Sequence, residues 1–241
     1  MIQIVAELGS NPAPGWKLKP YVMAAKYAGA DVVKLQLFRA EHFPEDEQSE
    51  KRVVQFPRPE DKYKDPDQLA RFARGCGDLK IRSMVSVFDC NAVEWMREAG
   101  VDYCKLAARE EGNTDLYYRV MAECLGGHHR HISVFASTQS WDRAAGLRNL
   151  GFFPMRTISQ YPTPMGLALR TLLHKPRDLR KWGWSSHTRG WLDCWLAMRL
   201  GATTIEKHLA LRAGEIEAGH SLLPEEFLWM TQKLRRGGAA K

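Results

Sequence analysis

Three segments of the sequence repeat one local pattern: the end of a helix, a glycine, a short apolar run and then a charged residue. The glycine and the charged residue of these segments are Gly29 and Lys34, Gly100 and Lys105, and Gly201 and Glu206. In all three segments the charged residue follows the glycine by five positions. A barrel of strand–helix repeats produces such a unit and keeps its chemistry at the carboxyl ends of its strands. The pattern therefore predicts both a fold and the place of a functional site.

Eight short apolar segments, rich in β-branched residues, are predicted to be strands. Their approximate bounds are 2–8, 32–37, 82–88, 103–107, 132–136, 155–160, 182–186 and 203–208. Most are continuous apolar runs, which are typical of parallel strands that are buried on both faces. Each is followed by a helical pattern, and this alternation of strands and helices indicates a closed barrel. We therefore predict an α/β fold, a single (β/α)8 TIM barrel that spans residues 1–241 as one catalytic domain.

Segments with a 3.6-residue apolar period lie between the strands, at 18–28, 66–75, 91–99, 115–125 and 191–200. Gly29, Gly100 and Gly201 stand where a left-handed helix C-cap belongs. One connection is long: residues 39–65, rich in charge and proline, follow the second strand. A loop of this length inside a barrel is either functional or poorly ordered, and we expect a partial lid or an oligomer contact.

Composition restricts the class of protein. The apolar content of 44% supports a large core. No apolar run approaches the roughly 20 residues that a membrane span needs, and the N-terminus shows no signal-peptide pattern, so we expect no membrane association. The five cysteines have neither metal-site nor disulfide spacing, which favours reduced thiols and a cytoplasmic location.

The net charge of +7 raises the question of nucleic-acid binding. The basic residues are dispersed, however, and the one dense cluster lies in residues 233–241. We interpret this segment as a frayed, solvated tail, and we expect no nucleic-acid partner. A basic balance also suits an enzyme that gathers anionic substrates.

Two histidines are candidate metal ligands. Side chains two apart on a strand share a face, so His187 pairs with Ser185 on the seventh strand and His208 with Glu206 on the eighth. Neighbouring strands lie about 4.8 Å apart, so both histidines can converge on one ion at the open end of the barrel. Imidazole suits Mn, Fe, Co or Zn. The alternative is that these are two unrelated polar histidines.

Two lysines, Lys34 and Lys105, project from the second and fourth strands. Lysines in a barrel mouth either bind anions or form Schiff bases. Hydroxyl groups around the rim favour phosphate binding over imine chemistry; they belong to Ser86, Ser137, Thr138 and Ser185. A plain ion pair, for instance between Lys34 and Glu7, is the alternative role.

Carboxylates and neutral donors complete the predicted mouth. Glu7, at the end of the first strand, and Glu206 can orient water, bind sugar hydroxyls or coordinate a metal. Gln36 and Tyr161 add neutral hydrogen-bond donors. The sequence Gln-Tyr-Pro-Thr-Pro at 160–164 predicts a rigid turn that presents Tyr161 over the mouth, although an aromatic ring beside prolines can also serve packing alone.

Motifs along nearly the whole chain resemble, in order, the N-terminal barrel of the sialic acid (N-acetylneuraminate) synthase family. They are AELGSN at 6–11, VKLQ at 33–36, SVFD at 86–89, KLA at 105–107, ST at 137–138, SQYPT at 159–163, WSSHT at 184–188, IEKH at 205–208 and the segment 217–226. Members of this family condense phosphoenolpyruvate with an N-acylated sugar aldehyde to make nine-carbon ulosonic acids. The resemblance implies a transferase of carbohydrate biosynthesis with the same barrel.

Carried over position by position, the resemblance implies a divalent metal, typically Mn²⁺, on His187 and His208. It implies that phosphoenolpyruvate is held by Lys34, Ser86, Lys105, Ser137 and Ser185. It also implies that the sugar side or the reacting centre is formed by Glu7, Gln36, Tyr161 and Glu206. Glu217 matches an acidic family position near the acceptor. The catalytic groups would be Glu7, Lys105 and Glu206, and the family habit implies a homodimer.

Several positions depart from the family pattern. The loop after the first strand reads Asn-Pro-Ala-Pro-Gly at 11–15, and residues unusual for the family are Ala108, Gln139, Ser186 and Arg212. These changes affect the acceptor side more than the metal and phosphate side. We therefore expect phosphoenolpyruvate as donor and an aldose or other aldehyde, rather than N-acetylmannosamine, as acceptor. We also expect that the family's small antifreeze-like C-terminal domain is missing, which leaves open whether another chain supplies it.

Two other functions remain as alternatives. The chain could be another metal-dependent barrel enzyme, an aldolase or lyase, and aldehyde chemistry without phosphate release would favour this. It could also be a non-catalytic barrel subunit, whose role would survive alanine at Lys105 or His208. The polar residues at the strand ends argue against the non-catalytic subunit, because a scaffold does not need them.

Overall fold

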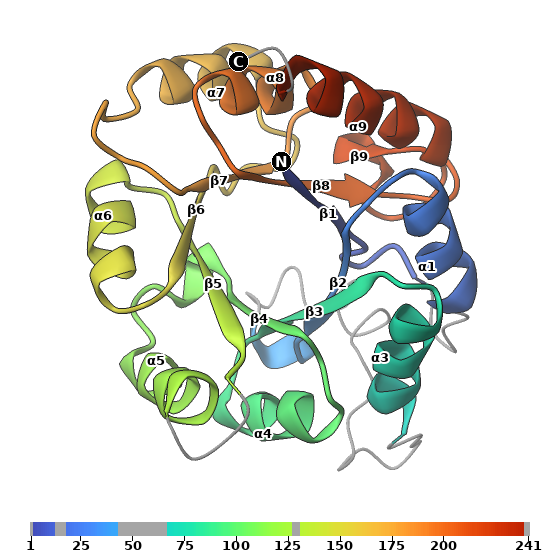
Figure 1. Cartoon of the computed structure of the whole chain (residues 1–241), viewed down its shortest axis with the longest axis vertical. Coiled ribbons are helices and arrows are strands. Elements are labelled where there is room, and N and C mark those ends of the chain that lie inside the picture. Colours follow the sequence, from blue (N-terminus) through green and yellow to red (C-terminus); the bar gives the residue numbers. More distant parts are fainter. Residues whose placement is uncertain (1, 13–17, 43–66, 127–130, 239–241) are drawn as a thin grey trace.

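Eight parallel strands form a closed ring in a computed structural model that describes residues 2–12, 18–42, 67–126 and 131–238. Figure 1 shows the ring from one end, with the helices outside it. The strands of the ring are β1 (Gln3–Glu7), β2 (Val32–Leu37), β3 (Arg82–Val87), β4 (Tyr103–Leu106), β5 (Ser133–Thr138), β6 (Phe153–Thr157), β7 (Gly183–Ser186) and β8 (Thr204–Leu209). Each strand pairs with the next, and β1 pairs with β8, which closes the barrel. The predicted (β/α)8 fold is confirmed.

The helices that cover the ring follow the strands in turn. They are α1 (Leu18–Tyr27), α3 (Gln68–Asp78), α4 (Cys90–Glu98), α5 (Thr114–Val120), α6 (Trp141–Asn149), α7 (Met165–Leu173), α8 (Leu192–Arg199) and α9 (Pro224–Gly238). Short helical turns lie at η1 (Ala40–His42), η2 (Ala108–Glu110), η3 (Met121–Leu125) and η4 (Ala218–His220), and a two-residue strand, β9 (Ser221–Leu222), pairs with the end of β8. Among these residues, no helix is long and apolar enough to cross a membrane.

Glycine ends several helices before the next strand begins. Gly29, Gly100 and Gly201 have φ angles of 80°, 75° and 95°, which is the left-handed conformation that glycine adopts without a steric penalty. The predicted C-caps are therefore confirmed, and each repeat turns from helix to strand in the same way. This fixed turn explains why the charged residue five positions later reaches the same level of the barrel.

One strand lies earlier in the sequence than predicted. β6 ends at Thr157, and residues 158–160 belong to the connection that follows. The carbonyl of Ile158 accepts a hydrogen bond from the His187 ring, and the carbonyl of Gln160 accepts one from the Thr163 hydroxyl. These carbonyl groups accept hydrogen bonds from side chains in loops instead of backbone hydrogen bonds from a neighbouring strand.

The interior of the ring has an apolar half and a polar half. Buried Val5, Val32, Met84, Phe135 and Met155 form a cluster of their own, separate from the larger core between strands and helices. The residue two positions further along each strand faces the same way. The inward side chains therefore change from apolar to polar toward the carboxyl ends, and the apolar cluster closes the barrel below the site.

The C-terminal segment corrects one expectation. Residues 233–238, expected to be a frayed tail, continue α9. Leu234 is fully buried, and Arg235 donates hydrogen bonds of 2.8 Å to the carbonyl of Gly29 and to Asp31. Apolar residues of α9 recur every three or four positions, so the helix packs on the barrel despite its basic end. Residues 239–241 and most of the long connection, 43–66, for which we expect a lid or an oligomer contact, lie outside the described residues.

Candidate active site

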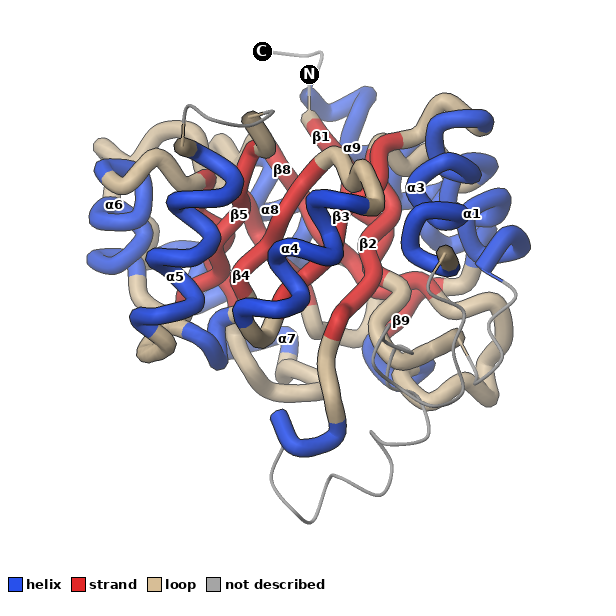
Figure 2. The backbone as a smooth tube through the Cα atoms, turned by 90° about the horizontal axis from the view of Figure 1, so that it is seen from below, coloured by secondary structure: helices blue, strands red, loops and turns tan. Residues whose placement is uncertain are grey.

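A cavity of about 740 Å³ opens at the carboxyl ends of the strands. In Figure 2 this end of the barrel lies at the bottom, on the side opposite the N-terminus. Twelve of the residues predicted from the sequence line this one cavity: Glu7, Lys34, Gln36, Ser86, Lys105, Ser137, Tyr161, Ser185, His187, Glu206, His208 and Glu217. Thr138, also predicted at the rim, does not line it, because its hydroxyl bonds to the backbone of Ser140. The structure therefore brings these twelve residues together, although it does not assign their roles.

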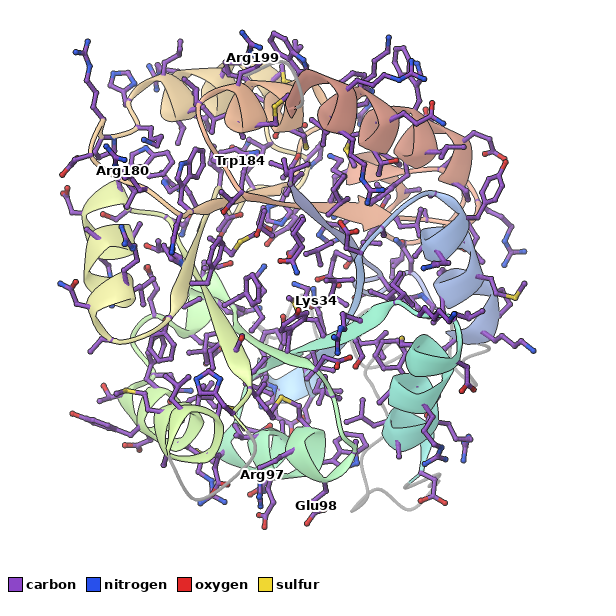
Figure 3. All side chains as sticks on the ribbon, viewed as in Figure 1. Lys34, Arg97, Glu98, Arg180, Trp184 and Arg199 are labelled. Carbon is purple, nitrogen blue, oxygen red and sulfur yellow. The ribbon has the colours of Figure 1, made fainter. Side chains whose placement is uncertain are left out.

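The deeper part of the cavity holds an ion-pair cluster, formed by Glu7, Lys34, Lys105, Ser185 and Glu206. One oxygen of Glu206 lies 2.9 Å from Lys34 Nζ and 2.6 Å from Lys105 Nζ, and it also accepts a hydrogen bond of 2.9 Å from the Ser185 hydroxyl. Lys34 forms a second ion pair with Glu7. All five side chains are buried, and Figure 3 shows Lys34 inside the ring of strands. The expected Lys34–Glu7 pair is thus present, as one part of a larger network.

Burial acts on the charges of this cluster in two directions. Burial opposes ionisation of Glu206, but Lys105 and Lys34 outweigh it and hold the pKa of this carboxyl below its usual range. Burial lowers the pKa of Lys34 to about 7, helped by the positive charge of Lys105 and opposed by Glu206. The lysines thus share one carboxylate oxygen, and Lys34 is partly protonated near neutral pH.

An anion fits this arrangement. Two cationic groups converge in a site with little water, where charge-assisted hydrogen bonds are strong. Ser137, on β5 next to the strand of Lys105, has a buried hydroxyl oxygen with no hydrogen-bond partner among the described residues. A buried hydroxyl without a partner is unfavourable, so its position in the cavity points to a ligand that it would bind.

The outer part of the cavity holds a histidine cluster, formed by His187, His208, Glu217 and His220. His187 follows β7, and His208 lies in β8; their ring centroids are 5.3 Å apart. His187 Nδ1 lies 2.7 Å from the Ile158 carbonyl oxygen, which can only accept, so this nitrogen carries the proton and Nε2 is the free base. Burial lowers the pKa of both histidines well below their usual value. The pKa of His187 is lowered further by His208, and the pKa of His208 is lowered further by Lys34. Neutral imidazole is the form of histidine that binds metal ions in proteins.

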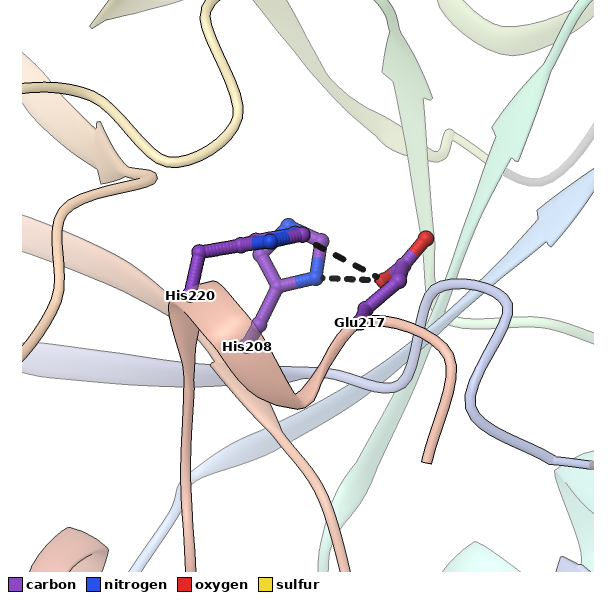
Figure 4. Close-up of side chains that lie close together, drawn as sticks. All are labelled: His208, Glu217 and His220. Atoms are coloured by element: carbon purple, nitrogen blue, oxygen red, sulfur yellow. Dashed lines mark hydrogen bonds and ion pairs between the residues drawn. The ribbon is translucent and has the colours of Figure 1, made fainter. Parts of the chain in front are cut away.

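Glu217 and His220 approach His208 from the loop after β8 (Figure 4). One Glu217 oxygen lies 2.8 Å from His208 Nδ1 and 3.9 Å from His220 Nε2. Potential ligand atoms of these three residues all lie within 4.8 Å of one another. Sequence analysis did not identify His220. Its three-residue spacing from Glu217, which puts both on one face of the turn η4, is the signal that could have found it.

The loop after β1 positions Glu217. The Glu217 backbone N–H donates to the Asn11 side-chain oxygen at 2.9 Å, and the Asn11 amide donates to the carbonyl of Leu209 at 2.9 Å. Gly9, with a φ of 54°, passes so close that a Cβ at this position would overlap the Glu217 carboxylate. A side chain of any size at position 9 would therefore displace Glu217.

Tyr161 covers the histidine cluster from the connection after β6. Its ring centroid lies 4.3 Å from that of His187 and 5.3 Å from that of His220, while the side chain stays 57% exposed. The predicted turn thus places this ring over the mouth. Cavity residues that sequence analysis did not single out include Arg109, Thr157 and Ser159. Thr157 is the last residue of β6 and faces the cavity. Because this strand was predicted to end at residue 160, Thr157 was not recognised as a strand-end residue.

Residues 21–241 match the model of the NeuB family. Among curated proteins, the N,N'-diacetyllegionaminic acid synthase of Campylobacter jejuni is 25% identical over 97% of this chain and 75% of its own length. An uncharacterised protein of Methanocaldococcus jannaschii is 28% identical over 96% of this chain and 69% of its own length.

Solved structures share the fold. The N-acetylneuraminic acid synthetase of Leptospira borgpetersenii superposes with a TM-score of 0.81 at 21% identity, covering 99% of this chain and 84% of that one. A truncated 3-deoxy-D-arabino-heptulosonate 7-phosphate synthase of Thermotoga maritima superposes with a TM-score of 0.68 at 13% identity, covering 99% of this chain and 87% of that one. At such identities the likeness shows the barrel alone.

Proposed function

Because this chain belongs to the NeuB family, we propose that it condenses phosphoenolpyruvate with a sugar or other aldehyde, giving an ulosonic acid and phosphate. The Campylobacter relative, an N,N'-diacetyllegionaminic acid synthase, supports a product of this type. The observation that carries the proposal is the cavity itself. It brings together two lysines, a serine hydroxyl that has no hydrogen-bond partner in the described part of the chain, and two buried histidines. The lysines and the hydroxyl suit an anionic donor, and the histidines suit a metal.

The ion-pair cluster would bind the donor. Lys34 and Lys105 would hold the carboxylate and phosphate of phosphoenolpyruvate, and Ser137 would donate a hydrogen bond to it. The Ser185 hydroxyl, which donates to Glu206, lines the same space. Glu206 keeps both lysines in place before the donor arrives, so little reorganisation is needed on binding. A third hydroxyl, that of Ser86, lies on β3 directly beside Lys105 in the strand register.

The histidine cluster would hold a divalent metal through His187 and His208. Their residue types, burial and neutral state fit such an ion. When bound, the ion would supply Lewis-acid polarisation of the acceptor aldehyde. Tyr161 covers this end of the cavity and would exclude water from the aldehyde. Gln36 would donate hydrogen bonds to hydroxyl groups of the acceptor, and Glu217 would accept hydrogen bonds from them.

The bond changes balance without a further reactant. Carbon 3 of phosphoenolpyruvate bonds to the aldehyde carbon, whose oxygen becomes a hydroxyl, and carbon 2 gains positive character. Water adds at carbon 2, and phosphate leaves by cleavage of the C–O bond. Glu7 and Glu206 both line this cavity, and either carboxylate would orient this water. One proton of the water balances the one gained by the aldehyde oxygen.

Phosphate release from phosphoenolpyruvate, measured across a panel of aldoses and N-acylated amino sugars, tests the proposal. We expect release that requires both an aldehyde and a divalent metal, with a product three carbons longer than the acceptor. Lys105→Met should abolish release without unfolding the protein. Release that does not depend on any aldehyde would show a phosphatase, and no release with any member would contradict the proposal.

An aldolase that forms a Schiff base is the second candidate, because a lysine with a pKa near 7 is nucleophilic at neutral pH. Lys34 is the residue concerned. Borohydride reduction in the presence of pyruvate, followed by mass spectrometry, separates the two. The synthase predicts no adduct, since Lys34 is held between Glu7 and Glu206. A pyruvyl group on Lys34 would favour the aldolase.

A further inference from the structure

The carboxylate of Glu217 differs from the other carboxylates that line the cavity. Glu7 and Glu206 form ion pairs with lysines. Within the described residues, the ion pairs of Glu217 involve imidazoles alone, those of His208 and His220. A buried carboxylate with no lysine or arginine beside it among the described residues is unfavourable, and it favours binding of a cation from solution.

The spacing of the donor atoms is close to what one ion requires. Two ligand atoms that each lie about 2.1 Å from an ion are about 3.0 Å apart at right angles and about 4.2 Å apart when opposite. The Glu217 oxygen lies 2.8 Å from His208 Nδ1 and 3.9 Å from His220 Nε2. An ion here would take the place of the proton that His208 shares with Glu217. Figure 4 shows the three side chains converging on this point.

The surroundings hold the donors in place. His208 is carried by β8, whose neighbours β1 and β7 fix it in the barrel wall. Glu217 is held by Asn11, and its own carbonyl accepts a hydrogen bond of 2.7 Å from Ser221. His220 packs edge to face against His208, with ring centroids 4.6 Å apart. The three residues are 3%, 9% and 8% exposed, so bulk water competes little with them.

We propose that His208, Glu217 and His220 form a metal-binding set of two histidines and one carboxylate, in which His220 is a ligand. Two imidazoles and a carboxylate with open positions suit borderline ions such as Fe²⁺, Co²⁺ or Zn²⁺ better than Mg²⁺ or Ca²⁺. The inference rests on the proposed function only for the presence of a metal in this cavity. Relative to the His187–His208 pair it adds two ligands, Glu217 and His220, and it predicts a preference for Co²⁺ over Mn²⁺.

Titration of the chelator-treated protein with Co²⁺ alone, followed by its visible absorption, tests the inference without substrate. We expect one Co²⁺ per chain, and His220→Gln and Glu217→Gln should each weaken Co²⁺ binding at least tenfold. The matched control is His174→Gln, since His174 is the exposed C-cap residue of α7 and does not line the cavity. It should leave the spectrum and the affinity unchanged. Circular dichroism and melting temperature should show that all three variants fold.

The outcomes separate this inference from the proposed function. Wild-type affinity in His220→Gln, with loss in His187→Gln and His208→Gln, would overturn the inference and leave the metal on the strand-end pair. Absence of Co²⁺, Zn²⁺ and Mn²⁺ binding in the wild type would overturn the inference and the metal dependence together. Phosphoenolpyruvate binding, measured without metal, would then show whether the donor site survives.

Discussion

The ion-pair cluster and the histidine cluster face the same cavity but are built differently. Every member of the ion-pair cluster is a strand residue, and the strand register alone sets its position. In the histidine cluster only His208 lies within a strand, while Glu217 and His220 come from the loop after β8. The first cluster is therefore as rigid as the barrel, whereas the second depends on contacts between loops. We expect the ion-pair cluster to determine stability and donor affinity, and the histidine cluster to determine the affinity for the metal and the acceptor.

The largest expected effect comes from removing the shared carboxylate of the ion-pair cluster. Glu206→Ala leaves Lys34 and Lys105 buried, close together and without their common partner. Breaking a buried pair in this way typically costs about 3–5 kcal/mol of unfolding free energy. Denaturant unfolding measures it. Glu94→Ala removes an exposed ion pair with Arg119 and should cost less than about 1 kcal/mol. Equal losses in the two variants would contradict the difference between buried and exposed pairs.

A substitution at Gly9 should separate the clusters. Gly9→Ala adds a Cβ that overlaps the Glu217 carboxylate, and it imposes a left-handed backbone cost of about 1–2 kcal/mol. Gly100→Ala imposes the same backbone cost at a φ of 75°, but no atom lies within 4 Å of the added Cβ.

Both variants should lose similar stability in thermal unfolding, while only Gly9→Ala should weaken metal binding. Phosphoenolpyruvate binding should survive in both. If Gly100→Ala also lost the metal, the loss in Gly9→Ala could not be assigned to Glu217.

The pH dependence of donor binding should follow Lys34. Burial lowers the pKa of this lysine to about 7, so in the free protein it is charged below pH 7 and neutral above. An anion prefers the charged form, so the Kd for phosphoenolpyruvate should rise with pH above 7, by up to about tenfold per unit. Calorimetric titration between pH 6.5 and 9 measures it. Lys34→Arg, which stays charged, should flatten the profile; a flat wild-type profile would contradict the lowered pKa.

The same pKa has a consequence for stability, with the opposite sign. The unfolded chain keeps Lys34 protonated up to its ordinary value of 10.5, while the folded protein has released that proton above about pH 7. The unfolded state therefore binds more protons between these values, and this group makes stability rise with pH in that window. The contribution should vanish in Lys34→Met.

The smallest expected effect concerns the hydroxyl of Ser137. Ser137→Ala removes a buried oxygen that has no hydrogen-bond partner among the described residues, so stability should stay the same or rise slightly. Phosphoenolpyruvate affinity should fall by about 1 kcal/mol, the usual worth of one hydrogen bond. Ser83→Ala is the reverse control, because Ser83 donates to Asp102 at 2.9 Å, far from the cavity. It should lose stability and keep donor affinity.

The contrast between the clusters also explains what could be predicted from the sequence. Strand side chains alternate with period two, so the position of Lys34, Lys105 or Glu206 after its glycine fixes both its face and its level. The barrel and the ion-pair cluster could be predicted from the sequence for that reason. His220 was not, because its place depends on Asn11 and Gly9, which are distant in sequence. The ordered end of α9 was missed similarly, since its packing depends on the barrel surface rather than on its basic composition.

Thermal unfolding with phosphoenolpyruvate, with and without Mn²⁺, tests the central claim most directly. A ligand at about 100 times its Kd adds roughly 2.7 kcal/mol of stability. In a chain of this length the melting temperature rises by about 2–4 °C per kcal/mol of added stability, so we expect a rise of about 5–10 °C. We expect a rise with phosphoenolpyruvate in the wild type and in His208→Ala, and a further rise with Mn²⁺ in the wild type only. No rise with phosphoenolpyruvate in either protein would contradict the claim that this cavity binds the donor of a synthase.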